Sequence, residues 1–234
     1  MKIRSLGLAV LAIAATAAPA SAANDPIEVH VRIEGKTKTL FDGTVATRGH
    51  DIDSGDGSGP HRCDGTNNHA NATAGPTVFA AFDDAREKAD ISWAGTWFPS
   101  FEDFGIDRIG PDSSDNANGR YWGQVVNYRD TDLGGCQQQI ESTDDVLFAY
   151  DSFSKPKLHL TGPKRAEAGR TILVKVVDGQ AGKAFKGARV AGHKTNGKGL
   201  VRVRFRHAGA KRLKATAPSA VRSNSLRVKV RAAS

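Results

Sequence analysis

Carboxylates and histidines gather in one loop, residues 49–73, of this 234-residue chain. Asp51, Asp53 and Asp56 are spaced so that their oxygens can converge on a hard cation such as Ca²⁺, and His61 adds a nitrogen that suits Zn²⁺. The spacing differs from that of an EF-hand, which needs Gly at its sixth position and a closing Glu. The alternative is a soluble loop whose Asp and Asn side chains hydrogen-bond to their own turns. Both interpretations stay open here.

No nucleophile of the sequence stands in a known catalytic motif. The chain has neither G-x-S-x-G nor H-E-x-x-H, and acidic pairs such as Glu102-Asp103 are expected in any acidic stretch. We therefore predict no catalytic residue and no cofactor, with Ca²⁺ or Zn²⁺ in the loop of residues 49–73 as the alternative. An exported enzyme or metal-binding protein working from that loop is the matching functional alternative.

Two segments near the C-terminus alternate cations with apolar residues, as strands do when every second side chain faces water. The cations are Arg202, Arg204 and Arg206 in one segment and Arg227, Lys229 and Arg231 in the other. If the two strands are neighbours, like charges oppose each other, which is destabilising and indicates a polyanion as partner. The alternatives are a face that only keeps the protein soluble, and a partner in the acidic half of this chain or of a neighbouring copy.

The N-terminus has the three parts of a secretory signal peptide. Lys2 and Arg4 precede an apolar run over residues 6–18, and Ala20-Ser21-Ala22 offers a small-x-small cleavage site. The run is shorter than the ~20 residues that span a bilayer, so we predict a signal peptide over residues 1–22 and no transmembrane segment in the mature chain. The expected location is secreted, extracellular or cell-wall associated, and the short Ala-rich signal is typical of bacteria.

Cys63 and Cys136 are predicted to form one disulfide, because an even pair of cysteines in an exported chain is usually oxidised. The bridge would close a loop of roughly 70 residues and stabilise the fold by about 4 kcal/mol on the chain-entropy model. A metal-bound or catalytic thiolate is the alternative, but no C-x-x-C spacing supports it.

Charge divides the mature chain into two halves. Residues 23–154 carry 10 Lys or Arg against 23 Asp or Glu, a net charge of −13, whereas residues 155–234 carry 21 against 2, a net charge of +19. The change falls at a short polar stretch that ends in Pro156. We predict one domain over residues 23–154 and a second over residues 155–234.

The acidic half is predicted to be α+β with one helix. Pro76 is a good helix start, and the helix is expected to continue to about residue 90. Alternating or apolar runs predict strands at residues 27–35, 39–47, 91–97, 106–109, 121–127 and 146–150.

The segments Gly119–Asn127 and Asp144–Asp151 resemble the family of unknown function related to the C-terminal β-domain of transcobalamin and intrinsic factor. That family has an aromatic-Trp pair leading into V-N-G and a later G-D-x-V-x-W-x-Y. Here Tyr128 replaces the Gly of the first motif, and Asp144 the Gly of the second. The resemblance implies a small β-grasp-like fold. The candidate ligand-binding residues of this half are Trp97, Tyr121, Trp122 and Asn127. The alternative is that the aromatic side chains, at strand positions, belong to the core.

The basic half is predicted to be a β-sandwich of short strands separated by Gly-containing turns. The expected strands are residues 158–160, 172–177, 188–191, 201–205, 213–215 and 226–230. Ala181–Lys183 and Gly187–Val190, followed by Thr195 and Gly199, resemble bacterial immunoglobulin-like modules. In such modules these residues form scaffold.

Together these patterns predict a mostly β, non-catalytic binding or adhesion protein at the bacterial cell surface. Its basic half would hold it to an anionic polymer of the cell envelope or to another surface ligand, and nucleic acid is not the favoured partner. A cobalamin-type carrier of a small ligand is the third functional hypothesis, and it rests on the family resemblance.

Overall fold

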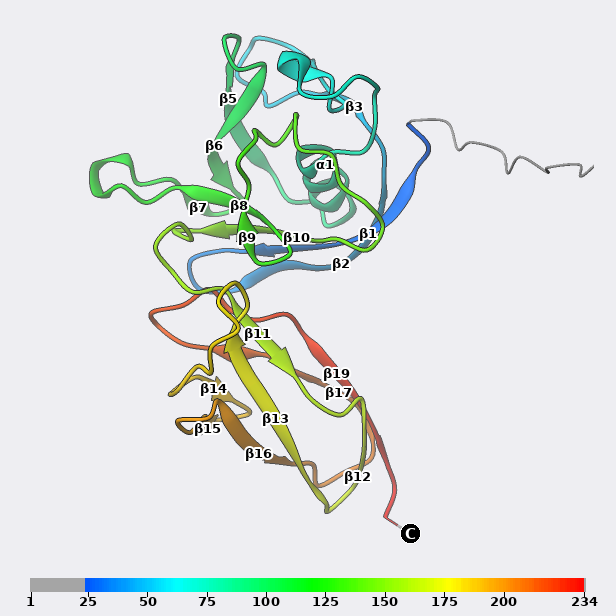
Figure 1. The fold of residues 1–234 in the computed structure, drawn as a ribbon, viewed down its shortest axis with the longest axis vertical. Coiled ribbons are helices and arrows are strands. Elements are labelled where there is room, and N and C mark those ends of the chain that lie inside the picture. Colours follow the sequence, from blue (N-terminus) through cyan, green and yellow to red (C-terminus); the bar gives the residue numbers. More distant parts are fainter. Residues whose placement is uncertain (1–23, 234) are drawn as a thin grey trace, which may run out of the picture.

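The computed structural model describes residues 24–233 and is mostly β, as predicted (Figure 1). The α-helix of this range, α1 (Val78–Lys88), begins where the Thr77 hydroxyl accepts a hydrogen bond from the Ala80 backbone N–H at 3.1 Å. Within residues 24–233 no helix is long and apolar enough to cross a membrane. The predicted signal peptide lies outside the described residues.

Five strands of the N-terminal part, residues 24–154, form one sheet in the order β2-β1-β10-β8-β9. Their bounds are β1 (Ile27–Glu34), β2 (Thr39–Thr47), β8 (Trp122–Val126), β9 (Arg129–Asp130) and β10 (Asp145–Tyr150). The β1–β10 pair is parallel and the other pairs are antiparallel. Helix α1 covers one face of this sheet, where Phe82 packs 4.6 Å from Phe148, ring centre to ring centre.

A second sheet and a hairpin complete the N-terminal part. The sheet has the order β5-β6-β7, and its strands are β5 (Trp93–Phe98), β6 (Asp103–Ile109) and β7 (Asp112–Ser113). The hairpin joins β3 (His50–Ile52) to β4 (His61–Cys63), and two 3₁₀ turns are η1 (Asn67–His69) and η2 (Asn116–Asn118). Phe79 of α1 contacts both Trp93 and Phe104, so aromatic rings join the helix to the second sheet.

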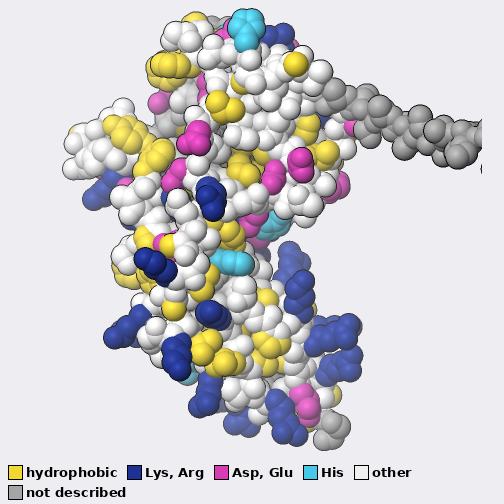
Figure 2. Space-filling view, in the orientation of Figure 1, with side chains coloured by type: hydrophobic (Ala, Val, Ile, Leu, Met, Phe, Trp, Pro, Cys, Tyr) yellow, Lys and Arg dark blue, Asp and Glu magenta, His cyan; other side chains and the backbone are white. Residues whose placement is uncertain are grey.

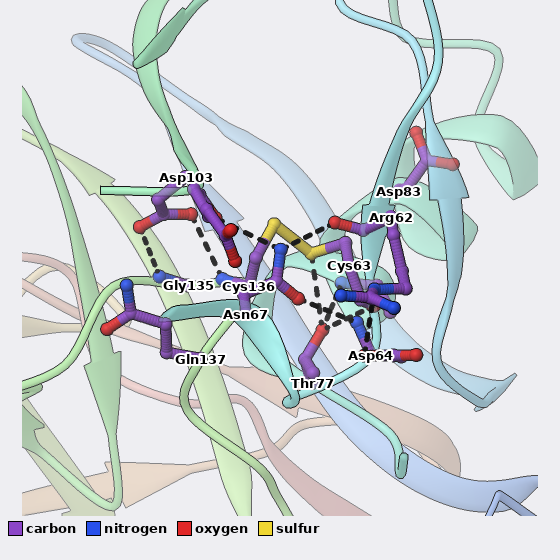
Figure 3. Close-up of a disulfide and its surroundings, with 12 residues drawn as sticks. Arg62, Cys63, Asp64, Asn67, Thr77, Asp83, Asp103, Gly135, Cys136 and Gln137 are labelled. Carbon is purple, nitrogen blue, oxygen red and sulfur yellow. Dashed lines mark hydrogen bonds and ion pairs between the residues drawn. A yellow bond between two sulfur atoms is a disulfide. The ribbon is translucent and has the colours of Figure 1, made fainter. Parts of the chain in front are cut away.

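The predicted disulfide between Cys63 and Cys136 is present and fully buried (Figure 3). It joins the end of β4 to a loop whose backbone N–H groups are also held by a side chain. The Asp103 carboxylate accepts hydrogen bonds from Gly135 at 2.8 Å and from Cys136 at 3.0 Å. The bridge and the carboxylate therefore fix this loop against β4 and β6.

The C-terminal part, residues 155–233, is built from two three-stranded sheets and a small third one. The first sheet contains β11 (Leu158–Thr161), β13 (Thr171–Asp178) and β16 (Leu200–Arg204), in this order; the second contains β12 (Arg165–Glu167), β19 (Leu226–Arg231) and β17 (Gly209–Leu213). The third contains β15 (His193–Lys194), β14 (Arg189–Val190) and β18 (Ala215–Thr216). Buried residues of the sheets, among them Val174, Val203 and Val228, form one core.

Among the described strands, each sheet draws its members from only one side of residues 151–157. The predicted strands are found with bounds that shift by a few residues. The exception is the strand expected at residues 213–215, which is divided between β17 and β18 at Lys214. Figure 1 shows the two parts stacked along the long axis of the molecule, with the C-terminus at the far end.

Candidate functional site

The acidic loop of the N-terminal part is held by its own carboxylates. Asp53 accepts a hydrogen bond from the backbone N–H of Gly55 at 2.8 Å, and Asp56 accepts one from that of Trp97 at 3.0 Å. Hydrogen bonds from Ser58 and from Trp97 hold the pKa of Asp56 below its usual range. Within residues 24–233, no group of three or more His, Cys, Asp or Glu side chains is placed to hold a metal ion. The contacts are those of a loop that caps its own turns.

His50, at the start of that loop, forms a polar cluster with Asp83 of α1. Its Nε2 lies 3.1 Å from Asp83, and this hydrogen bond raises the pKa of His50 to about 8. Arg86 also pairs with Asp83. His50 and Asp83 line a hollow of about 390 Å³, and exposed Asp51 lines it too. His50 is therefore protonated at neutral pH and acts as a cation for Asp83 rather than as a free base.

The predicted ligand-binding aromatics have different environments. Trp97 stacks on His61, with ring centres 4.0 Å apart. Trp122 is buried in the core and donates its indole N–H to the Asp112 carbonyl at 3.0 Å, whereas its neighbour Tyr121 is exposed. Of these three, Trp122 lines a small cavity between β6 and β8.

Asn127, the fourth predicted ligand-binding residue, holds a turn. Its side-chain amide N–H donates to Asp144 at 2.7 Å, and its side-chain Oδ1 accepts from the backbone N–H of Asp145 at 3.0 Å. Its φ of 50° places it in the left-handed region, which Asn tolerates better than most residues. Its contacts are those of a structural residue at the β8–β9 turn.

The two predicted rows of cations lie on different sheets. Arg202 and Arg204 belong to β16, with Arg206 just beyond it, whereas Arg227, Lys229 and Arg231 belong to β19. Alternate residues of both strands point into the shared core, so the two rows face water on opposite sides of the sandwich. The condition that the two strands are neighbours is therefore not met. Figure 2 shows Lys and Arg side chains spread over the C-terminal part.

Like charges nevertheless meet on the β12–β19–β17 face. Arg165 of β12 lies opposite Lys229, and Arg212 of β17 lies opposite Arg227. Among the described residues only Arg212 of these four has a carboxylate partner, Asp42, at 2.8 Å. Cations directly opposite each other across strands are destabilising, so this face has a surplus of positive charge that the protein itself neutralises only in part.

The surface is hollowed beside three of these cations, Arg212, Arg227 and Lys229. Two hollows of about 490 and about 560 Å³ share Lys164 and Arg227, and we call them together the cationic groove. The cations that line it are Lys164, Lys211, Arg212, Arg227 and Lys229. On the opposite face, Arg202 lies across from Leu173 and Arg204 across from Thr171, so no cations oppose each other in those pairs.

Other cations of the C-terminal part bind the acidic half of the same chain. Lys214 and Arg222 both pair with Glu34, which is only 1% exposed. Lys214 also contacts Asp42 at 3.1 Å, together with Arg212. Arg212, Lys214 and Arg222 thus have acidic partners in the other half of the same chain, as the third alternative of the sequence analysis proposed for the basic half. None of the three belongs to the two alternating rows of cations.

Apolar contacts support these ion pairs. Val125, Leu147 and Ala149 of the N-terminal sheet pack with Val221 of the C-terminal part. Nearby, the ring centre of Tyr128 lies 4.8 Å from that of His159. The two parts thus share a contact surface with both apolar and charged components.

His30 completes the charged network on the N-terminal side. Its Nδ1 lies 3.3 Å from Asp145 and its Nε2 lies 3.2 Å from Asp42. Hydrogen bonds to Asp145 and then to Asp42 raise the pKa of His30 to about 9. Burial would raise the pKa of Asp42, but the His30 hydrogen bond and the attraction of Lys214 outweigh it and keep that pKa below its usual range.

Comparison of the chain with models of known protein families gives no match. Comparison with curated proteins gives no match either. The transcobalamin-related and immunoglobulin-like resemblances therefore stay predictions, and functional conclusions depend on the geometry described above.

Proposed function

We propose that this chain is a non-catalytic binding protein of the cell surface, which holds an anionic polymer of the cell envelope in its cationic groove. The observation that carries the proposal is the pairing of like charges, Arg165 with Lys229 and Arg212 with Arg227, beside a hollow surface. A polyanion would neutralise charges that oppose each other in the free protein.

The arrangement of the cations suits an extended polymer. Arg227 and Lys229 of the groove are two residues apart on β19, and this places them about 6.7 Å apart along the strand. Arg231, the next cation of the row, lies opposite Glu167. A chain with regularly repeated phosphates or carboxylates can contact several of them at once, with an affinity that depends on salt. The row of Arg202 and Arg204 is regular too, but neutral residues lie opposite it.

The cell-surface location is part of the proposal. The signal-like sequence of residues 1–22 supports it, and so does the disulfide between Cys63 and Cys136, since such bonds persist mainly in oxidising compartments. An enzyme working from the loop of residues 49–73 is the weaker hypothesis, because Asp53 and Asp56 are already used as hydrogen-bond acceptors within the fold.

Binding of purified poly(glycerol phosphate) and of polygalacturonate to the mature chain, measured against NaCl concentration, tests the proposal and distinguishes phosphate from carboxylate polymers. We expect binding that weakens with salt and is unchanged by EDTA. The double variant R227Q/K229Q should lose about tenfold in affinity near 0.1 M salt. Its plot of log K against log salt should also be less steep, with the magnitude of the negative slope smaller by about 1 to 1.5.

The matched control is R202Q/R204Q, which removes the same charge from the opposite face of the sandwich. It should retain most of the affinity, because its residues are remote from the groove. Equal losses in the two double variants, or no salt-sensitive binding of either polymer, would show that the groove is not the binding site.

A further inference from the structure

A small cavity of about 170 Å³ lies at the edge of the N-terminal sheet, away from the cationic groove. Strand β9 pairs with β8 only at Val125 and Val126, so Trp122 to Gln124 have β10 as their only neighbouring strand among the described ones. The cavity opens beside this unpaired stretch of β8, between it and β6. Phe104, Ile106 and Trp122 form its apolar wall.

The polar side of the cavity consists of groups that can accept hydrogen bonds. Asp130 binds the Lys157 ammonium through Oδ2 at 2.7 Å, while its Oδ1 is buried and has no hydrogen-bond partner among the described residues. Gln124 donates its amide N–H to the Leu133 carbonyl, which leaves its own side-chain oxygen as an acceptor. The Thr131 hydroxyl also lines the cavity.

Lys157 decides which charge the cavity prefers. This lysine is only 2% exposed, and its ammonium neutralises the carboxylate of Asp130. Asp130 Oδ1 therefore lacks a hydrogen-bond donor, whereas the negative charge of the carboxylate is already neutralised. Neutral hydroxyl groups supply such a donor without placing an unpaired charge beside the apolar wall.

An exposed aromatic ring stands at the mouth of the cavity. Phe153 is 61% exposed although it lies in the polar segment between the two parts of the chain. It rests on Gly123 of β8, where a Cβ atom would lie 3.4 Å from the Phe153 ring and would overlap the Ser152 hydroxyl. The missing side chain at Gly123 thus lets Ser152 and Phe153 approach the strand.

We propose that this cavity binds a single sugar ring, whose hydroxyls donate to Asp130 and Gln124 while one face of the ring covers Phe153. The combination of a few acceptors with an apolar wall and an exposed aromatic ring suits a molecule that has both hydroxyls and C–H faces. The cavity is below the ~300 Å³ of ordinary ligand pockets, so it takes one ring rather than an oligosaccharide. The site shares no residue with the cationic groove and is independent of it.

Saturation-transfer NMR of the mature chain with glucose, galactose and N-acetylglucosamine, each in turn, tests this site. We expect at least one of the sugars to give saturation-transfer signals. Phe153→Ala should lower the affinity for that sugar by about tenfold, because the substitution removes the aromatic face. Asp130→Asn should weaken binding as well, because an amide accepts hydrogen bonds less strongly than a carboxylate.

Two control variants separate binding from folding. Phe101→Ala removes another exposed phenylalanine, one that does not line this cavity, and should leave binding unchanged. Lys157→Gln removes the ion pair but keeps the carboxylate of Asp130. Its melting temperature and sugar affinity therefore show how much of the effect of Asp130→Asn comes from loss of the Asp130–Lys157 contact alone. The proposal is overturned if none of the three sugars binds, or if Phe153→Ala and Phe101→Ala have the same effect on binding. Ethanolamine, a small cation with one hydroxyl, is a further probe. If it binds in a salt-dependent way and the sugars do not, the cavity prefers a positive charge and the proposal is overturned.

Discussion

His30 shows how one side chain can report on the contact between the two parts of the chain. It lies between Asp42 and Asp145; Asp42 also receives Arg212 and Lys214 from the C-terminal part, and Asp145 receives Arg32. Because its pKa is raised in the folded state, protonated His30 stabilises the fold. That contribution is fully present below pH 6.5 and is lost as the pH rises through about 9.

We therefore expect His30→Gln to lower the free energy of unfolding by about 1–2 kcal/mol at pH 6, a figure reduced from the full linkage value because His30 is partly solvated. Near pH 10 the difference from the parent protein should be small. Urea unfolding at the two pH values measures both, with His193→Gln of exposed β15 as the control. The same deficit at both pH values would contradict a role for the His30 charge.

At the scale of elements, the N-terminal part is stabilised by a disulfide that lies outside its main sheet. The loop after β4 contains only one short 3₁₀ turn, η1, and its contacts come largely from side chains. Asn67 donates to the carbonyls of Arg62 and Glu102. The Cys63–Cys136 bridge lies beside Asn67 (Figure 3). The disulfide therefore stabilises the region in which regular backbone pairing is scarce.

Replacing both cysteines, Cys63→Ala with Cys136→Ala, should lower the free energy of unfolding by about 4 kcal/mol, because the bridge spans 73 residues of the chain. Chemical denaturation, followed by tryptophan fluorescence, measures the change; the three tryptophans all lie in the N-terminal part. Treatment of the parent protein with a reductant under denaturing conditions is the matched control. A loss below about 1 kcal/mol would mean that the side-chain contacts suffice without the bridge.

At the scale of the whole molecule, the opposite charges of the two halves serve partly to join them. Glu34 is buried with two cations, Lys214 and Arg222, and a cluster of apolar residues lies on the same contact surface. Removal of the cations leaves a carboxylate in a place that water hardly reaches, and such unpaired charges are costly. Part of the positive charge of the C-terminal part thus joins the two halves, and another part lines the cationic groove.

The parent protein should unfold in one calorimetric transition, because the shared contact surface couples its two parts. The double variant Lys214→Gln/Arg222→Gln should lose about 3 kcal/mol or more and resolve into two transitions. Arg204→Gln with Arg202→Gln, which removes equal charge from an outer face, should leave the single transition intact. Two transitions in the parent protein itself would show that the contact does not couple the parts.

Local patterns were enough to predict the mostly β fold and most of its elements. Alternation at β1, β16 and β19 follows from the two-residue period of a strand, which needs no knowledge of the neighbouring strand. The disulfide was predictable because cysteine number is a property of the chain itself. The helix was predicted two residues too early, because it begins at Val78 with Thr77 as its N-cap and Pro76 precedes it. The division of charge at about residue 154 was also visible in the sequence.

Strand order and the docking of the two parts could be decided only by the tertiary structure. Alternation revealed two rows of cations but not that β16 and β19 belong to opposite sheets, because pairing between remote strands leaves no local mark. For the same reason no sequence pattern identified Glu34 as a contact residue, although it is buried against residues about 180 positions further along. Charge interactions depend on distance in space, so the sequence determined which charges are present and the fold determined which of them are neutralised.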